Sequence, residues 1–402
     1  MKNKVFLILS VLVFTILLVV MGGCKAAPPT AKGPIKIGGS YAMTGFLAEL
    51  GIDSHRAALI CLEQANYEVA GRPIEFIAED NASEASVCLD KVRKLVETDG
   101  VCIITGPILT FGTDAQGPYL AQRNVPFLTN SCITDRCVLS ENPHWPGWGH
   151  AGTLRQRTCT SGYYAFDELG YRTATTLVTD YSAGYEYQDG FNEAFVERGG
   201  EILQEQFFPI DTLDFTPFII NLVDADCLSI TPIGPIIPLF TQLREQGVFD
   251  KMDVVVSTDC GSFDQALLQE LGGAAVGVVG ESHYHFTSDS PGNAEFVQLY
   301  QDKYGKPPPS YAGMGYISMQ IILDALERAG GDTSFEALTK ALAETELQTI
   351  RGVITFGPDG VGNTDSQIMR ITGPATLETV AGYRSGAEIV GDQLVVTSER
   401  TD

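Results

Sequence analysis

From about residue 35 onwards, short apolar runs alternate with longer segments in which apolar residues recur every three or four positions. Runs of the first kind are typical of buried strands, and segments of the second kind are typical of helices with one buried face. Strands are predicted at residues 35–38, 74–78, 101–105, 125–129, 173–178, 202–208, 227–230, 253–257 and 277–281. Because helical patterns separate most of these strands, we expect an α/β fold of parallel sheets flanked by helices.

Local signals predict where several helices begin and end. Asp53 and Ser83 are each expected to cap a helix, because a short polar side chain precedes an apolar-periodic segment. Gly100 is expected to end the second of these helices. Further helices are predicted at residues 114–122, 160–169, 187–198, 239–246, 294–304, 311–329 and 334–344. Near the C-terminus, residues 352–356 and 367–371 predict a pair of hairpin strands, followed by weak strand patterns.

Residues 143–149 (PHWPGWG) interrupt the alternation of strands and helices. Prolines and glycines at this density cannot continue a helix or a central strand. Because the chain has 402 residues, it has room for two lobes. We interpret residues 143–149 as a passage between these lobes, and residues 282–286 as a second passage.

The N-terminus has the pattern of an export signal. Lys2 and Lys4 precede an apolar segment at residues 5–20, which is too short and wrongly flanked for a membrane span. The following residues 20–24 (VMGGC) resemble a bacterial lipobox, which implies cleavage before Cys24 and lipidation of its thiol. An ordinary signal with an incidental cysteine is the alternative. We therefore expect a signal peptide at residues 1–23 and a flexible lipidated tether at residues 24–34.

Charge and cysteine content narrow the class of protein. The formal charge is −24 at pH 7 and no basic run occurs, which argues against a nucleic-acid partner. Nine cysteines minus Cys24 leave eight, none in CxxC spacing, so a zinc or thioredoxin-like site is disfavoured. We expect Cys137 to be oxidised, with Cys132 or Cys159 as its partner. Cysteines in apolar strands can instead be free buried thiols.

Signatures of catalysis and of bound cofactors are lacking in the sequence. It contains no GxSxG elbow, no GxGxxG after the first strand, no P-loop and no HExxH motif. His283 and His285 stand two residues apart and would share one face of a strand. Without a third nearby ligand we interpret them as packing residues rather than a metal pair. The sequence therefore predicts no catalytic residues, no metal and no cofactor.

Polar and aromatic residues follow several of the predicted strands at their carboxyl ends. Open α/β sheets bind ligands at this edge. Thr110 follows the strand at residues 101–105 and precedes a helix, so the backbone N–H groups around it suit a carboxylate, although Thr110 can also act only as a cap. The set that we expect to face a cleft is Met43, Thr44, Thr110, Ser131, Cys132 and Ile133 from the first lobe, and Tyr181, Gly184, Gly234, Pro235, Thr258 and Asp259 from the second.

The order of several motifs resembles one family. The segments IKIGG, YAMTGFLAELG, EDNAS, VCIITGPILTFGT, NVPFLTN, TDYSAGYEYQDGF, LDFTPFI, TDC and ITFGPDG occur in sequence after the lipobox. They are similar to the branched-chain amino-acid-binding group of type I periplasmic solute-binding proteins, over about residues 35–373. The resemblance implies two Rossmann-like lobes joined by three hinge crossings. It places lobe 1 at residues 35–153 and 284–347, and lobe 2 at residues 154–283 and 348–402.

The resemblance also implies roles for individual residues. Thr110 matches a Ser/Thr that binds the ligand carboxylate, and residues 131–133 match a loop that also holds the ligand. Asp259 matches an acidic position that accepts an ammonium group. Leu50, Gly234 and Pro235 match positions that carry pocket aromatics in some relatives. Ala183 departs from the family, which often has an aromatic residue there, and Tyr181 or Tyr185 is the candidate to compensate.

The function implied by the resemblance is capture and delivery of a small molecule, without chemistry. We expect an exported protein, lipid-anchored on the periplasmic or extracellular face, that passes an amino acid to the membrane subunits of an ABC permease. Because of the departures, a small amide such as urea, or another small carboxylate, stays open as the ligand. A ligand-sensing module for a signalling receptor is the alternative function.

Overall fold

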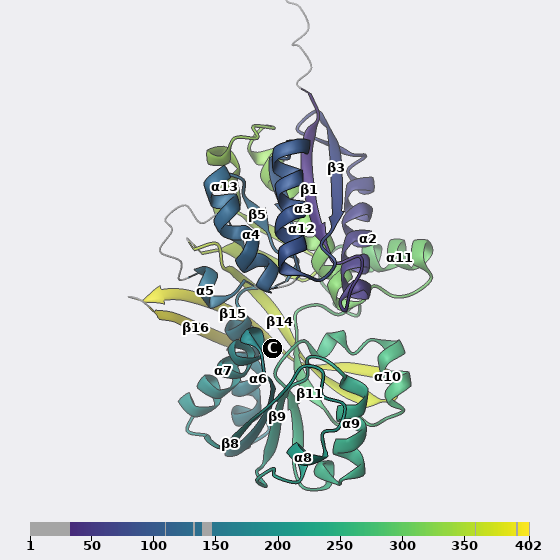
Figure 1. The fold of residues 1–402 in the computed structure, drawn as a ribbon, viewed down its shortest axis with the longest axis vertical. Helices are drawn as coiled ribbons and strands as arrows, with labels where there is room; N and C mark the ends of the chain where they lie inside the picture. The colour runs from purple at the N-terminus through teal and green to yellow at the C-terminus, as the bar shows by residue number, and fades with distance from the viewer. Residues whose placement is uncertain are drawn as a thin grey trace, which may run out of the picture. The chain divides into compact units, whose positions relative to one another are not determined.

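The computed structural model describes residues 33–108, 110–131, 133–138, 147–357, 359–390 and 393–401 (Figure 1). The predicted signal peptide, the predicted lipidation residue Cys24 and the predicted site residue Cys132 lie outside the described residues. Residues 35–402 form one compact unit that contains two sheets flanked by helices. The predicted α/β class is therefore confirmed.

The first sheet has six strands in the order β2-β3-β1-β4-β5-β6. All neighbours are parallel except β2 and β3. Ile103 and Ile104 point to opposite faces of the sheet, as successive strand residues do, and each enters a different apolar cluster with a different pair of helices. The strands are β1 (Ile35–Tyr41), β2 (Glu68–Val69), β3 (Arg72–Asp80), β4 (Ile103–Thr105), β5 (Phe127–Leu128) and β6 (Gly147–Trp148). The helices are α2 (Ala48–Gln64) and α12 (Ser310–Arg328) on one face, and α3 (Ala85–Lys94) and α4 (Thr110–Arg123) on the other.

The second sheet joins parallel central strands to antiparallel strands from the end of the chain. Its parallel strands are β7 (Thr173–Thr179), β8 (Glu201–Phe208), β9 (Cys227–Thr231), β10 (Asp253–Val256) and β11 (Val279–Ser282). Its antiparallel strands are β12 (Glu346–Thr349), β13 (Gly352–Phe356), β14 (Gly362–Gly373), β15 (Thr376–Val390) and β16 (Gln393–Arg400). Both sheets are thus mixed, so the expectation of parallel sheets is correct only for their central strands.

Short and long helices cover both faces of the second sheet. Helices α6 (Leu154–Asp167) and α7 (Ser182–Glu197) share one apolar cluster with its strands, and α9 (Ile236–Glu245) and α10 (Gln265–Leu271) share another. The other helices are α5 (Asp135–Val138), α8 (Thr216–Ile219), α11 (Asn293–Tyr304) and α13 (Phe335–Ala343). Single turns lie at η1 (Leu95–Asp99), η2 (Val248–Asp250) and η3 (Cys260–Ser262). The helix α10 is absent from the sequence-based expectations.

The chain passes between the two sheets three times. The first passage joins β6 to α6, and the second joins β11 to α11, which is followed by α12 and, like α12, packs on α2. The third lies in β14, whose first residues pair with β13 and whose later residues pair with β11. Ile354 and Phe356 of β13 belong to the apolar core of the first sheet. We therefore propose that the third lobe boundary lies near Val361 rather than at residues 347 and 348.

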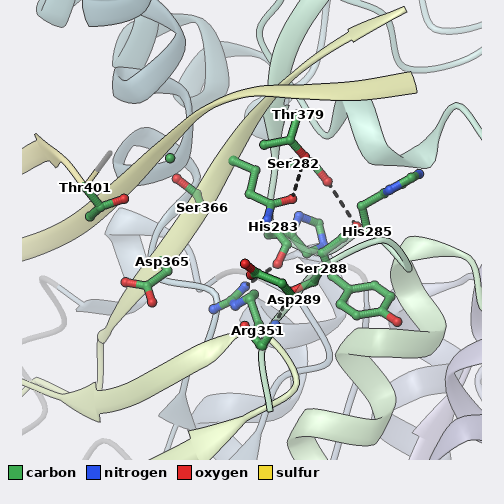
Figure 2. Close-up of a pocket in the computed structure, with 14 residues that line it drawn as sticks. Ser282, His283, His285, Ser288, Asp289, Arg351, Asp365, Ser366, Thr379 and Thr401 are labelled. Atoms are coloured by element: carbon green, nitrogen blue, oxygen red, sulfur yellow. Dashed lines mark hydrogen bonds between the residues drawn. The ribbon is translucent and has the colours of Figure 1, made fainter. Parts of the chain in front are cut away.

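One buried arginine contacts all three passages. Arg351 lies in the turn between β12 and β13 and is 6% exposed. Its guanidinium donates to the carbonyl oxygen of His150 at 2.8 Å and to that of His283 at 3.1 Å. It also donates to Oγ1 of Thr364, in β14. Figure 2 shows Arg351 beside His283. Arg351 therefore connects the first, second and third passages through a single charged group.

Two predicted helix caps are wrong. The helix α2 begins at Ala48, so Asp53 lies inside it, where its carboxylate accepts from Oη of Tyr300 and Nζ of Lys306, both at 2.7 Å. Ser83 has a positive φ of 58° and precedes the N-cap residue of α3, Glu84. An N-cap residue requires extended backbone angles, so Ser83 cannot act as one. Its hydroxyl instead donates to the carbonyl oxygen of Thr44.

The weak strand patterns predicted after residue 371 correspond to two long strands, β15 and β16, which pair as a C-terminal hairpin. Strands β15 and β16 pair over eight positions, and their Ala387 and Leu394 pack against Ile133 and Val138 of the first lobe. The segment predicted as an irregular passage also contributes the short edge strand β6, because its Gly147 and Trp148 pair with β5. The last strands of the chain therefore support a loop that belongs to the first sheet.

One expected disulfide is not formed. Cys159 is a free, buried thiol whose Sγ contacts the carbonyl oxygen of Gln156 at 3.0 Å. It belongs to an apolar cluster with Tyr163 and Ala194 in the packing of α6 on α7, and it forms no disulfide bond. The alternative pairing of Cys132 with Cys137 lies outside the residues whose side chains the structure describes.

Candidate functional site

A cavity of about 690 Å³ lies where strand ends of both sheets face each other. The first sheet and its helices contribute Phe46, Leu47, Leu50, Ile108, Thr110, Phe111, Ser131 and Tyr311. The second sheet and its helices contribute Tyr181, Ala183, Tyr187, Ile210, Pro232, Ile233, Gly234, Pro235, Ile236, Thr258, Asp259, Ser262 and Phe263. A cavity of this size accommodates a small molecule and not a macromolecule.

Polar groups of the first sheet come from the loops after β4 and β5. Thr110 is the first residue of α4, so the positive end of this 14-residue helix lies at the cavity wall. Ser131 follows β5 and is 4% exposed. Its carbonyl oxygen accepts from Oγ1 of Thr129 at 2.8 Å, which fixes the turn that presents it. This side of the cavity therefore suits an anionic group such as a carboxylate.

Aromatic side chains dominate the remaining walls. Tyr181 is the N-cap residue of α7, and burial raises the pKa of its phenol, so it remains a neutral hydrogen-bonding group. Tyr187 lies on the same helix and Tyr311 on α12. Three phenylalanines, Phe46, Phe111 and Phe263, complete this set of six aromatic wall residues. Such walls favour a ligand with an apolar group of substantial size.

Asp259 provides the carboxylate of the second sheet. It follows β10 and is 5% exposed, and its Oδ1 accepts from the backbone N–H of Gly261 at 3.1 Å. Its Oδ2 accepts from Oγ of Ser262 at 2.9 Å and from Oγ of Ser310 at 2.6 Å. Since a carboxylate oxygen accepts about two hydrogen bonds, Oδ2 is saturated and Oδ1 keeps one free position.

A buried charged pair lies next to Asp259. The guanidinium of Arg157 donates to Oε2 of Glu281 from Nε at 3.1 Å and from Nη2 at 2.7 Å. Nη2 of Arg157 also lies 3.8 Å from Oδ1 of Asp259. Burial raises the pKa of Glu281 to about 7, although Arg157 opposes this shift. His283 completes the group, with its Nδ1 3.6 Å from Oδ1 of Asp259.

The structure brings together four of the six predicted site residues. Thr110, Ser131, Tyr181 and Asp259 all line the cavity. Ile133 is not among the described wall residues, because its side chain is fully buried in the cluster with the C-terminal hairpin. Its N–H is also bound, to the carbonyl oxygen of Gly152 at 3.0 Å. A direct ligand contact by Ile133 is therefore not supported by this geometry.

The positions carried over by family resemblance also reach the cavity. Leu50, Gly234, Pro235 and Ala183 line it, and Tyr181 does so beside Ala183. The other candidate to compensate for Ala183 was Tyr185, which is instead 41% exposed and donates to Oδ1 of Asp180. Sequence reasoning missed five of the aromatic wall residues. Three of these five residues could have been found from the sequence, because Phe46, Phe111 and Tyr187 lie at or near helix starts that follow predicted strands.

A second cavity of about 350 Å³ lies near the passages (Figure 2). Its walls are mainly polar and come from residues 282–290, Arg351, β14 and β15. His283 lines this cavity and also contacts Ser310 and Asp259 of the main site. His285 also lines it, and its Nδ1 pairs with Oγ1 of Thr287 at 2.7 Å. The two histidines noted in the sequence therefore have different neighbours.

Comparison with known proteins identifies the family. Residues 34–376 match the model of the periplasmic binding protein family. The chain belongs to this family. Among curated relatives, the Leu/Ile/Val-binding protein homolog 6 of Brucella melitensis is 25% identical over 339 residues, which cover 83% of this chain and 84% of the relative.

Solved structures share the fold of this binding protein over nearly its whole length. An ABC transporter substrate-binding protein from Sphaerobacter thermophilus is 27% identical, with a TM-score of 0.78 and coverage of 92% of this chain and 97% of its own. A solute-binding protein from Rhodopseudomonas palustris, in complex with 3,4-dihydroxybenzoic acid, is 24% identical, with a TM-score of 0.76 and the same coverage.

Family membership defines the general role of the chain. It is an exported binding protein of the ABC transporter type, and the family serves transport rather than catalysis. Within the described part of the chain, no helix has the length and apolarity needed to cross a membrane.

Proposed function

We propose that this binding protein captures an amino acid with an apolar side chain, branched or aromatic, and delivers it to an ABC permease. Cys24 anchors it by a lipid to the membrane from which it is exported. One observation carries this proposal: a helix start and Ser131 on one side of the cavity face Asp259 on the other, with apolar walls between them.

Each end of such a ligand has a suitable partner. The carboxylate binds at the start of α4, with donors from Thr110 and Ser131. The ammonium group binds the free position on Oδ1 of Asp259. Closure of the two lobes on the ligand would exclude water and so strengthen this pairing. Urea fits poorly, because its polar edges would face aromatic walls without hydrogen-bond partners.

An aromatic carboxylate without an amino group is a second candidate. Six aromatic wall residues and the small Ala183 provide room for a ring. The neighbour from Rhodopseudomonas palustris is in complex with 3,4-dihydroxybenzoic acid, which supports this candidate by analogy of fold. Asp259 separates the two candidates, because only the amino acid needs its negative charge.

Calorimetry on variants tests the proposal, after a melting-temperature screen of amino acids, amides and aromatic carboxylates has found the ligand. Truncating one partner of a buried charged pair typically costs about 2–5 kcal/mol, so Asp259→Asn should weaken an amino acid roughly thirtyfold or more. Thr110→Ala should cost about 1.5–3 kcal/mol. Asp302→Asn, an exposed surface change on α11, is the matched control and should bind as wild type does.

Two results would change the proposal. If Asp259→Asn binds the ligand as tightly as the wild type does while Thr110→Ala loses affinity, the ligand is a carboxylate without an amino group rather than an amino acid. If both variants bind the ligand as tightly as the wild type does, the ligand does not bind at this site. Transport and sensing separate in cells: deleting the gene should abolish uptake of the labelled ligand, whereas a sensing module would leave uptake intact.

A further inference from the structure

A group of three acceptor residues lies behind the wall of the main cavity. Asp259, Glu281 and His283 each offer one nitrogen or oxygen atom within 4.8 Å of the other two. All three side chains are nearly inaccessible, with exposed fractions of 5%, 0% and 1%. Of the three, Asp259 alone lies among the described residues that line the cavity. The group therefore sits deeper than a ligand in that cavity.

Two atoms of this group lack the hydrogen bonds that burial demands. Oε1 of Glu281 and Nδ1 of His283 have no hydrogen-bond partner among the described residues. Leaving such atoms unsatisfied costs free energy, and a buried orphan in a native protein often marks an ion or water.

Ser310 determines which nitrogen of His283 carries the proton. The hydroxyl of Ser310 has one hydrogen, which it donates to Oδ2 of Asp259 at 2.6 Å. Its 3.3 Å contact with Nε2 of His283 therefore requires that Nε2–H donates to Ser310. Nδ1 then presents a lone pair, 3.6 Å from Oδ1 of Asp259. Two acceptors face each other here, which is unfavourable unless a cation lies between them.

The other oxygens of the two carboxylates are already held in place. Arg157 binds Oε2 of Glu281 through two N–H groups, and Ser262 and Ser310 bind Oδ2 of Asp259. Groups that hold the outer atoms of ligating carboxylates and imidazoles are what orients metal ligands in proteins.

We propose that Oδ1 of Asp259, Oε1 of Glu281 and Nδ1 of His283 bind a divalent transition-metal ion. Two oxygens and one imidazole nitrogen suit Zn²⁺, Mn²⁺ or Co²⁺ better than Mg²⁺ or Ca²⁺, which prefer oxygen alone. Ligand atoms about 2.1 Å from a metal lie roughly 3–4 Å apart, so three residues that offer ligand atoms within 4.8 Å of one another need only a small contraction. An amine in the main cavity reaches Asp259 but not the two deeper residues, so it would leave Oε1 of Glu281 and Nδ1 of His283 without partners.

A metal at this position changes what the main cavity prefers. Two positive charges beside Asp259 cancel its attraction for an ammonium group, and Arg157 adds to the effect. The metal-loaded protein should therefore bind amino acids more weakly than the metal-free protein. Open coordination positions on the cavity side can then take water or an oxygen atom of another ligand.

The test is titration of the EDTA-treated, purified protein with Co²⁺ and Zn²⁺, followed by calorimetry and by the visible absorption of bound Co²⁺. We expect one equivalent of metal per chain. Glu281→Gln and His283→Gln should each weaken metal binding about hundredfold or more, because the first removes the negative charge of one ligand and the second replaces an imidazole nitrogen by a weakly ligating neutral amide. The matched control is His285→Gln, two residues along the same passage, which should bind metal as wild type does.

Several outcomes would overturn the proposal. Absence of metal binding by the wild-type protein would do so directly, whatever happens to the variants. If His285→Gln loses as much metal affinity as His283→Gln does, the metal does not bind specifically at His283. If Glu281→Gln and His283→Gln melt like wild type and still bind Co²⁺ with the same absorption, the three residues are not the ligands. If either variant fails to fold, the wild-type titration and the remaining variant decide.

Discussion

Replacing Arg351 by methionine should destabilise the protein strongly. Methionine keeps much of the apolar length of arginine but removes the guanidinium that contacts all three passages. Hydrogen bonds to charged groups contribute about 1.5–3 kcal/mol each, so three of them set an upper range of roughly 4.5–9 kcal/mol. Part of this is regained because a buried charge no longer has to be desolvated. We therefore expect a loss of about 3–5 kcal/mol in the free energy of unfolding.

Urea unfolding of the purified variants measures this effect. The matched control is Arg384→Met on β15, because Arg384 pairs with Asp365 at 2.8 Å but is 40% exposed. Surface pairs of this kind contribute about 0–1 kcal/mol, so the control should lose little. Arg351→Lys should fall between the two, since an ammonium group cannot reach all three acceptors. If Arg351→Met loses no more than Arg384→Met, the passages do not depend on this arginine.

Three further predictions concern pH, anchoring and closure. Burial and Asp135 raise the pKa of Glu186 to about 8, so its carboxyl is protonated in the folded state and ionised in the unfolded state between about pH 4.5 and 8. Stability should fall as pH rises through this window, and Glu186→Gln should reduce the fall in melting temperature between pH 5 and pH 8.5. Cys24→Ser should move the protein from the membrane to the soluble fraction, and equal membrane retention would contradict the lipid anchor. Saturating ligand should lower the radius of gyration in solution scattering, as domain closure requires, whereas an unchanged radius would indicate a rigid cavity.

The central strands were predictable because their signal is local. Residues 101–105 form an apolar, β-branched run that ends at Gly106, and this composition by itself favours a buried strand. Helix starts were less predictable because distant residues determine them. Asp53 has the chemistry of a cap, but Tyr300 and Lys306 bind its carboxylate inside α2. A sequence pattern contains no information on such partners.

The candidate site was predictable only where topology determines it. Thr110, Ser131, Tyr181 and Asp259 all follow strands at their carboxyl ends, and in an open α/β sheet these ends meet at one edge. The pair of Arg157 and Glu281 has no such signal, because the two residues lie 124 positions apart and meet only after folding. Ile133 lies only two residues after Ser131 in the sequence, but its side chain is buried in the cluster with the C-terminal hairpin.

The C-terminal hairpin affects the order in which the binding site can form. Ile133, two residues after Ser131, packs against Ala387 and Leu394 near the very end of the chain. During export from the N-terminus, the loop with Ser131 emerges long before the hairpin that covers it. Contacts between such distant segments form late in folding, because a long loop must close first. The loop with Ser131 therefore gains its full support only when these strands have formed, and a variant without β15 and β16 should hold this loop less firmly.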